Sequence, residues 1–516
     1  MSRTITRTIF RSSCEIIHTE TLALKDDWRE PQSPGPRSRF SRGWMPVTLR
    51  KRNIRKQAIA GSANQDDLPE SLMAMAARAG PVRILVINIE DRLPELHADD
   101  HYRDAYVVLC RGGVCIGDVM INLTTGLESI HNRLRETITS LQAMVPDLAN
   151  RPVVVDSDLP YISIVIPTIV TRTDALRRCI ECIEELDYPN YEVLLVDNRR
   201  LLPESDPLPG LVDGKALRVI RESRPGVSAA RNAGVANADS DVIAFVDDDV
   251  RVDRQWLRAI GTRLAMNPEM EVVTGLILPA EMESPAQIWY ERYYGGFNGP
   301  RTFLPLTLEA DPRSPRLLRG SRILTRDSRG AAHRSLAVYG IGAYSAGANM
   351  TFRKSTIERI GYFDVALGTG TPALGGEDLA AIITVLWTGG KMGYEPSAVT
   401  YHQHRREYSE LLRMLDGNGL GFTAMLASLV RSDPRHLLGL SSQFSSAVKK
   451  IVVERGRKIR GMSADETINQ KSGPLYPSFL AKREFRAFLR GPLGYFRSRL
   501  WWRKLSSAHS RLDDRT

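Results

Sequence analysis

Three consecutive carboxylates, Asp247, Asp248 and Asp249, follow an apolar run at residues 242–246. The run predicts a buried strand that delivers these acidic side chains to its exposed end. Hard divalent cations such as Mg²⁺ take oxygen ligands, typically one or two carboxylates together with substrate phosphates. An acidic turn at the start of a helix gives the same pattern, because Asp caps helices well. The triplet alone leaves both interpretations open, and the motifs elsewhere in the chain favour the metal site.

A segment at residues 225–234 predicts a loop that leads into a helix at residues 228–237. Free N–H groups and the helix dipole at such a point favour anions, and Gly226 lies just before it. Arg231 adds a guanidinium group whose fork of donors suits phosphate. We therefore expect this segment to lie beside a phosphate-bearing ligand.

Two further polar residues follow predicted strands. Asp197 ends the strand predicted at residues 191–196, where its carboxylate could accept hydrogen bonds from a base or a ribose; an ordinary turn Asp is the alternative. His402 follows the strand predicted at residues 397–401. We expect the side chains of His402 and His404, two residues apart, to face opposite ways. At most one of them should point at the site.

Glu377 and Asp378 stand at the start of the helix predicted at residues 379–387. Carboxylates in the first turn of a helix can simply be caps that interact with the helix dipole. Here they follow a glycine-rich segment at residues 368–376, which could present a carboxylate to a substrate as a general base. The pair is therefore a candidate for the catalytic group.

The elements that must position these residues alternate between strand and helix from residue 158 to about residue 405. Such alternation predicts an α/β domain with a largely parallel sheet that is covered on both faces. Thr168, Asp197 and Asp247 each follow a predicted strand. Ligands in open α/β sheets bind at the carboxyl ends of strands, so these residues should cluster at one edge.

Residues 160–405, roughly half of the chain, resemble the catalytic domain of family-2 glycosyltransferases, the inverting, nucleotide-sugar-dependent type with a GT-A fold. The resemblance depends on motifs that occur in the family's order. These motifs are Ile164-Val165-Ile166-Pro167-Thr168, Val196-Asp197, the 226–234 segment, Phe245 to Asp249, Gly347-Ala348-Asn349-Met350, Gly361-Tyr362-Phe363-Asp364, Gly376-Glu377-Asp378 and Pro396 to His402. The chain departs from the family in two places: Ile169-Val170 replaces the usual Tyr-Asn, and Asp197 is followed by Asn198-Arg199 rather than by a second acid.

The resemblance implies a role for each matched residue. A nucleoside diphosphate sugar, expected to be of the UDP type, would be the donor, and Mn²⁺ or Mg²⁺ would be the metal. The hydroxyl of a glycan or lipid-linked molecule would be the acceptor. The implied roles are nucleoside or sugar binding for Pro167, Thr168, Asp197, Gly226, Arg231, Asp247 and Asp248, metal binding for Asp249, Asp247 and His402, general base for Asp378, and acceptor binding for Glu377.

The implied fold is GT-A, with a Rossmann-like nucleotide-binding half, an acceptor half and a mixed, mostly parallel sheet. We expect four parts along the 516 residues. They are a disordered basic segment (1–75), a small β-rich accessory domain (76–157) with a hairpin around Arg111-Gly112-Gly113, the catalytic domain (158–405) and a helical basic region (406–516).

The net charge of +10 suggests an anionic partner. Residues 449–504 carry 15 Lys and Arg against 4 Asp and Glu, interleaved with aromatic residues. That pattern is typical of an interfacial helix on an anionic membrane, and equally of a basic face packed on the catalytic domain. No apolar run approaches the ~20 residues of a membrane span. We expect a cytoplasmic protein that is peripheral on the inner face of the plasma membrane.

Two other classes of protein fit the sequence less well. A nucleotidyltransferase should show a glycine-rich basic loop after the first strand, where this chain has Pro167-Thr168-Ile169-Val170. A non-enzymatic binder of membranes or nucleic acid would use the basic termini, but no nucleic-acid motif is present, so we expect no nucleic-acid partner. The pair Cys179 and Cys182 lies in an amphipathic run and predicts thiols packed in a core rather than a zinc or redox site.

Overall fold

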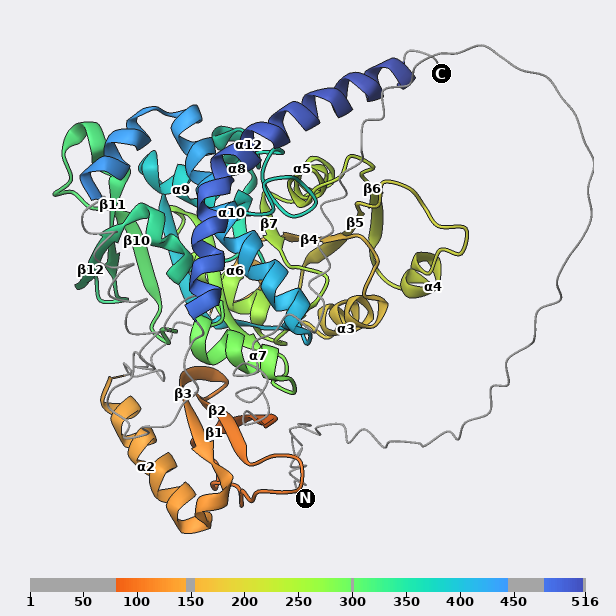
Figure 1. Cartoon of the computed structure of the whole chain (residues 1–516). Helices are drawn as coiled ribbons and strands as arrows, with labels where there is room; N and C mark the ends of the chain where they lie inside the picture. Colours follow the sequence, from red (N-terminus) through yellow and green to blue (C-terminus); the bar gives the residue numbers. More distant parts are fainter. Residues whose placement is uncertain (1–79, 145–153, 298–300, 444–477, 514–516) are drawn as a thin grey trace, which may run out of the picture. The chain divides into compact units, whose positions relative to one another are not determined.

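The computed structural model describes residues 80–144, 154–297, 301–443 and 478–513 (Figure 1). The predicted disordered segment at residues 1–75 lies outside these residues. The boundaries predicted at residues 157 and 405 stay predictions.

The first described part is a three-stranded sheet of β1 (Val82–Asn88), β2 (Asp104–Arg111) and β3 (Val114–Asn122), in that order. Strands β2 and β3 form the predicted hairpin, whose turn uses positive φ angles of 54° at Gly112 and 79° at Gly113. Helix α2 (Leu127–Met144) was not predicted. Its signal was present, because Ile130, Leu134 and later apolar residues recur at helical spacing and pack on the sheet.

Both faces of β2 are buried. Ala105, Val107 and Leu109 pack with α2 on one face. Tyr106 and Val108, which point the other way, join a cluster with residues of the second sheet that include Leu276, Leu278 and Val399. The small sheet therefore shares a hydrophobic core with the part of the chain that carries the predicted catalytic motifs.

The second sheet has eleven strands among the described residues, in the order β12-β11-β10-β14-β9-β13-β7-β4-β5-β6, with β8 paired to β14. Its strands are β4 (Ile162–Thr168), β5 (Tyr191–Asp197), β6 (Arg218–Arg221), β7 (Val242–Phe245), β8 (Val250–Val252), β9 (Met270–Pro279), β10 (Leu306–Ala310), β11 (Arg322–Arg326), β12 (Ala332–Ala337), β13 (Met350–Arg353) and β14 (Lys391–His402). Strands β7, β4, β5 and β6 run parallel, as expected for the nucleotide-binding half.

The expectation of a mostly parallel sheet needs correction, because antiparallel pairings outnumber parallel ones among the described strands. The difference arises at residues 281–342. That segment contains β10, β11 and β12, which extend the sheet with antiparallel pairings: β10 pairs with β14, β11 with β10, and β12 with β11. These strands are five or six residues long and rich in polar residues, so they lacked the apolar run that marked the parallel strands.

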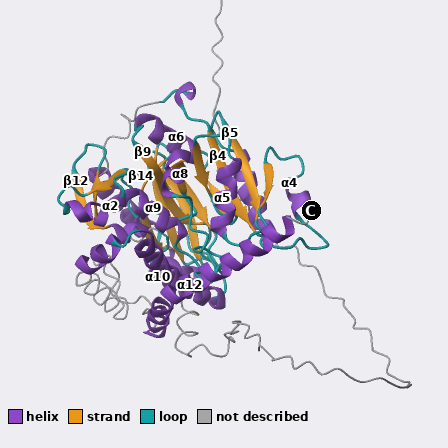
Figure 2. Cartoon of the chain, turned by 90° about the horizontal axis from the view of Figure 1, so that it is seen from above, coloured by secondary structure: helices purple, strands orange, loops and turns teal. Residues whose placement is uncertain are grey.

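Helices cover both faces of the large sheet, as predicted and as Figure 2 shows. Alternate residues of β4 separate the two cores: Val165 packs on one side, and Ile164 and Ile166 pack on the other. The helices are α3 (Thr173–Glu184), α4 (Leu208–Val212), α5 (Val227–Asn237), α6 (Trp256–Met266), α7 (Pro285–Trp289), α8 (Lys354–Ile360), α9 (Glu377–Trp387), α10 (Tyr408–Ser432) and α12 (Ser478–Asp513). Cys179 and Cys182 are free thiols on α3, as predicted.

The predicted helical C-terminal region is present, and its helices α10 and α12 pack side by side. The two helices approach closely at Gly491, where an added Cβ would lie 1.9 Å from Thr423 Oγ1. Arg483 on α12 binds the carboxylate of Asp416 on α10 with two hydrogen bonds of 2.8 and 2.7 Å. Among the described residues, no helix is both long and apolar enough to cross a lipid bilayer.

Candidate active site

The carboxyl ends of β4, β5 and β7 meet at one edge of the sheet, as the sequence predicted. Pro167 and Thr168 end β4, and Thr168 pairs in register with Asp197 at the end of β5. Thr168 Oγ1 donates a 2.7 Å hydrogen bond to Asp248 Oδ2 in the turn after β7. The same Oγ1 accepts from the N–H of Val170, a non-glycine residue with a φ of +54°. A strained residue of this kind is often found at a functional site.

Asp247, Asp249 and His402 form a cluster that could hold a metal ion, with one ligand atom from each lying within 4.8 Å of the others. His402 ends β14, and the pairing of β14 with β8 places it opposite Val250, next to the triplet. His402 Nε2 lies 3.4 Å from Asp249 Oδ1. Its Nδ1 is buried and has no hydrogen-bond partner among the described residues. Two carboxylates and one imidazole are a donor set that fits Mn²⁺ or Mg²⁺.

The electrostatics of this cluster suit cation binding. Burial lowers the pKa of His402 to about 4, so the imidazole is neutral near pH 7, the form that binds metals. Burial alone would raise the pKa of Asp249, but His402, Arg172 and Arg405 outweigh it and lower the pKa. Burial and repulsion by Asp249 raise the pKa of Asp248 to about 6. Asp249 is thus the most firmly ionised member of the triplet.

Arg172 was not predicted from the sequence, and among the described residues it is the cation that lies nearest to the triplet. Its guanidinium Nη2 lies 2.5 Å from Asp249 Oδ2 and 3.8 Å from Asp248 Oδ1. Arg172 precedes α3 as its N-cap residue. No motif around the triplet indicated Arg172, because this residue lies more than 70 positions before the carboxylates that it contacts.

Arg231 has different partners from the phosphate contact that was predicted. Its side chain is only 2% exposed. Nη2 lies 3.1 Å from Asp247 Oδ1, and Nη1 lies 2.6 Å from Glu377 Oε1. Nη2 also donates to the carbonyl of Gly347 at 3.3 Å. Arg231 is therefore a buried bridge between the acidic triplet and the start of α9.

Asp378 is more accessible than its neighbour Glu377, which is buried against Arg231. Asp378 Oδ2 accepts a 2.7 Å hydrogen bond from the N–H of Gly347, and Oδ1 accepts one from Leu379. Each carboxylate oxygen can accept a second bond, so Asp378 keeps capacity for a substrate hydroxyl. Burial and the charge of Asp378 raise the pKa of Glu377, against the opposing charge of Arg231.

The helix start near Gly226 is less open to anions than predicted. The Gly226 N–H donates to Asn198 Oδ1 at 2.9 Å, and the Val227 N–H donates to the carbonyl of Thr369 at 3.0 Å. Gly226 has a φ of +120°, and a Cβ there would lie 3.0 Å from Thr371 Cγ2. The glycine-rich segment at residues 368–376 thus packs against the start of α5, and two of the N–H groups expected for phosphate are already used.

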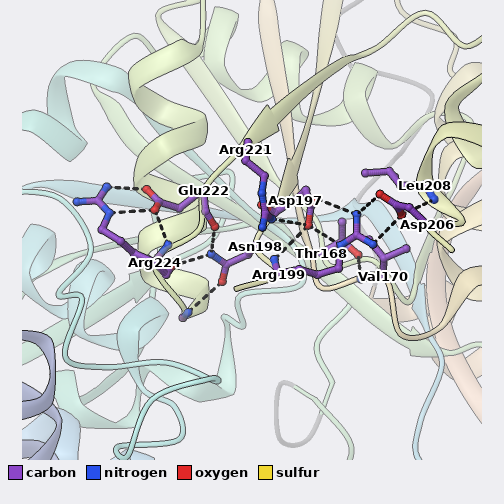
Figure 3. Close-up of polar contacts among 11 residues, drawn as sticks. Thr168, Val170, Asp197, Asn198, Arg199, Asp206, Leu208, Arg221, Glu222 and Arg224 are labelled. Atoms are coloured by element: carbon purple, nitrogen blue, oxygen red, sulfur yellow. Dashed lines mark hydrogen bonds and ion pairs between the residues drawn. The ribbon is translucent and has the colours of Figure 1, made fainter. Parts of the chain in front are cut away.

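Asp197 is also already paired, as Figure 3 shows. Its side chain is 3% exposed and binds Arg199 through hydrogen bonds of 2.9 and 2.8 Å to Nε and Nη2. Arg221 Nη1 lies 3.1 Å from Asp197 Oδ1, and Arg199 also forms an ion pair with Asp206. Burial alone would raise the pKa of Asp197. The hydrogen bonds from Arg199 and the positive charges of Arg199 and Arg221 outweigh burial and lower the pKa. Asp197 thus holds two arginines at the end of β5.

Residues 163–316 match the sequence model of Glycosyl transferase family 2. One relative is the glycosyltransferase AglE of Haloferax volcanii, 29% identical over 119 residues, which are 20% of this chain and 36% of the relative. Another is the pre-mycofactocin glycosyltransferase of Mycobacterium tuberculosis, 25% identical over 248 residues, 48% of this chain and 43% of the relative. The chain thus spans less than half of the length of these two relatives.

Among solved structures, a mannosyltransferase from Pyrobaculum calidifontis, described in complex with GDP-Man and Mn²⁺, is similar at a TM-score of 0.40 and 14% identity. The likeness covers 69% of this chain and 94% of that one. The sheet, the ordered motifs and the family match together define a glycosyltransferase domain of the α/β class. Residues 163–316 match glycosyltransferase family 2, in agreement with the resemblance seen in the motifs.

Proposed function

We propose that this protein is an inverting, metal-assisted glycosyltransferase that moves a sugar from a nucleoside diphosphate to a hydroxyl of a glycan or lipid-linked acceptor. The observation that carries the proposal is the Arg231 bridge. One end of this guanidinium pairs with Asp247 of the metal-ligand cluster, and the other pairs with Glu377, the neighbour of Asp378. A cation site and a candidate base therefore lie on either side of one buried residue, as a displacement at an anomeric carbon requires.

In this proposal Asp249, Asp247 and His402 hold Mn²⁺ or Mg²⁺, which when bound neutralises charge on the departing diphosphate. Asp378 accepts the proton of the acceptor hydroxyl as that oxygen bonds to the anomeric carbon. The bond from this carbon to the diphosphate oxygen breaks, and the nucleoside diphosphate leaves with the electron pair. Attack opposite the leaving group inverts the anomeric configuration. Glu377 helps to place the acceptor, and Arg231 positions Asp247 and Glu377.

Pro167, Thr168 and Asp248 lie at the strand ends where a nucleoside would bind, and we assign them to the ribose and base of a UDP-type donor. Thr168 holds Asp248 in place through its hydroxyl. Because Asp197 is paired with two arginines, we assign it to the framework of this subsite.

A panel of nucleoside diphosphates and nucleotide sugars, each with and without Mn²⁺, tests the proposed donor site by thermal shift. A ligand that binds only the folded protein raises its melting temperature. We expect metal-dependent stabilisation by one nucleotide, which would also identify the base. No response to any nucleotide would contradict the proposed donor site.

Asp249→Asn should remove most of the metal-dependent part of that stabilisation. The amide cannot supply the negative charge that holds a cation, while the side chain keeps its size. We expect the apparent nucleotide affinity in Mn²⁺ to fall by about tenfold or more, which corresponds to about 1.4 kcal/mol. Asp174→Asn, which changes an exposed carboxylate on the nearby helix α3, is the matched control. Unchanged affinity in Asp249→Asn would exclude direct coordination by this residue.

We further propose that α12 docks on an anionic membrane surface. Five large apolar side chains, each between 53% and 69% exposed, follow one another at helical spacing on this helix: Phe485, Leu489, Leu493, Phe496 and Leu500. The opposite side of α12, with Tyr495 and Trp502, is buried. Exposed cations flank the apolar stripe at Lys482, Arg486, Arg490, Arg497, Arg503 and Lys504. An apolar stripe edged by cations suits the boundary between anionic headgroups and acyl chains.

Replacing Leu489 and Leu493 together by Ser should weaken binding to vesicles that contain phosphatidylserine. Each Leu side chain that leaves water contributes about 1.5–3 kcal/mol, so the loss should be about tenfold or more. Flotation of the full chain with vesicles measures it. The control replaces Leu437 and Leu438, which are similarly exposed but lie outside α12. Equal binding by both double variants, or no binding by the unchanged protein, would reject the membrane proposal.

A further inference from the structure

A row of buried polar side chains leads away from His402 and was not indicated by any motif. His404 Nε2 lies 2.5 Å from Glu291 Oε1, and Glu291 Oε2 accepts a 2.7 Å hydrogen bond from Arg301 Nη2. The side chains of His404, Glu291 and Arg301 are only 1%, 5% and 9% exposed. The row therefore consists of paired groups that solvent hardly reaches.

The ring of His402 contacts two other rings, and one of them belongs to His404 in this row. Its ring stacks on that of His404, with centroids 5.4 Å apart and planes inclined by 26°. Phe297 lies against it with a centroid separation of 4.6 Å. The prediction that the two His side chains face opposite ways was wrong, because residues two positions apart in extended backbone lie on the same face. They lie side by side and contact different carboxylates, Asp249 and Glu291.

Glu291 belongs to a short π-helix, Tyr290–Tyr294, that continues α7. Single π turns are rare and are often found at functional sites, because the extra residue changes which side chains face inward. Tyr290 from the same turn packs edge-on against His404, with centroids 4.7 Å apart. This turn therefore brings both a carboxylate and an aromatic ring to His404.

The other end of the row reaches the small N-terminal sheet. Arg301 Nη1 donates a 3.3 Å hydrogen bond to the hydroxyl of Tyr106 on β2, and that hydroxyl donates to the carboxylate of Asp118 on β3. Arg301 Nε also donates to the carbonyl of Ile277 on β9 at 3.0 Å. The hairpin and the large sheet thus fix the same guanidinium from two sides.

A contribution to stability does not by itself explain why the charged groups of this row are buried. Burial would raise the pKa of Glu291, but Arg301 and His404 outweigh it and lower the pKa to about 2. Buried ion pairs are often no more stabilising than apolar residues of similar size, because both charges lose their hydration. What this pair does provide is a fixed direction for the His404 ring and, through stacking, for His402.

We propose that Tyr106, Arg301 and Glu291 are positioning residues that orient His402 for cation binding, so that the hairpin β2–β3 is part of the metal site. The inference rests on the proposed function, since it assumes that Asp247, Asp249 and His402 bind the cation. Partners of metal-binding histidines commonly set the orientation of the ring, and their loss lowers metal affinity by about 10–100-fold.

Tyr106→Phe and Glu291→Gln test the inference in the full chain with metal alone. Tyr106→Phe keeps the ring in its core and removes only the hydroxyl. Binding of Mn²⁺ is measured from the electron paramagnetic resonance of free Mn²⁺, and Co²⁺ and Mg²⁺ are then titrated as competitors. We expect both variants to bind Mn²⁺ about tenfold more weakly. Co²⁺ should lose more affinity than Mg²⁺, because imidazole contributes more to Co²⁺ than to a cation that prefers oxygen.

Tyr102→Phe is the matched control. The Tyr102 hydroxyl donates a 2.7 Å hydrogen bond to Glu283, so it also joins the N-terminal part to the segment before α7, but it does not lead to His402. His402→Ala gives the reference for complete loss of the imidazole.

The outcomes separate the inference from the function on which it rests. No Mn²⁺ binding by the unchanged protein would overturn the metal site, and the positioning role with it. Binding that is lost in His402→Ala but kept in Tyr106→Phe and Glu291→Gln would overturn only the positioning role. Equal losses for Co²⁺ and Mg²⁺, or an equal loss in Tyr102→Phe, would show a general structural effect and would also overturn it.

Discussion

Asp378→Asn is expected to lower the rate of sugar transfer by about 10²–10⁴-fold, the usual contribution of a general base. The amide cannot take a proton from the acceptor hydroxyl. Donor affinity should stay nearly unchanged, because the proposed metal ligands and Thr168 are not altered. The Asn oxygen can still accept from the N–H of Gly347 or from that of Leu379, but no longer from both. A modest loss of stability should therefore accompany the loss of transfer.

Single-turnover transfer and nucleotide affinity, measured on the same preparation, distinguish this result from unfolding. Glu377→Gln is the comparison, because Glu377 is adjacent and paired with Arg231. We expect it to reduce stability more and transfer less than Asp378→Asn does. A variant of Asp378 that loses donor binding yet turns over at the normal rate would refute its assignment as the base. The reverse pattern at the two positions would transfer that role to Glu377.

Arg231→Met should destabilise the protein by about 3–5 kcal/mol, as expected when one partner of a buried ion pair is removed. Arg231 is 2% exposed, and without its guanidinium two carboxylates, Asp247 and Glu377, would face each other across the site. The methionine fills much of the volume, so the loss is mainly electrostatic. Denaturant unfolding measures the change in the free energy of unfolding.

Two further variants test the cause of that loss. Arg177→Met removes an exposed ion pair with Asp174 on α3 and should cost no more than about 1 kcal/mol. Adding Glu377→Leu to Arg231→Met removes one of the unpaired carboxylates and should restore part of the stability. A loss in Arg231→Met as small as in Arg177→Met would mean that the buried bridge contributes little to folding.

The strands and acidic motifs of the nucleotide-binding half were predictable because their signals are local. An apolar run of four to seven residues gives β4, β5 and β7, and the residues just after these strands must lie at one edge of the sheet. Asp249 and His402, far apart in sequence, were paired by the family resemblance. The structure brings them within 3.4 Å of each other.

Where the prediction of local structure was wrong, the signal was weak or mixed. Strands β10, β11 and β12 are short and polar, and each is completed by a pairing within the sheet: β10 with β14, β11 with β10, and β12 with β11. Helix α2 has apolar residues at helical spacing, but most of its residues are polar, so the helical pattern was not recognised. In both cases tertiary contacts complete an element whose own sequence specifies it poorly.

The family resemblance, the α/β order of elements and the positions of the acidic groups could be read from the amino-acid sequence, because a motif and a periodicity are properties of neighbouring residues. The partner of each polar group depends on the tertiary structure. It placed Arg231 between two carboxylates, paired Asp197 with Arg199, covered the start of α5 and brought Arg301 from a distant loop to Tyr106. The physical reason is that a buried charge or N–H must find a partner, and that partner is chosen by packing in three dimensions rather than by distance along the chain.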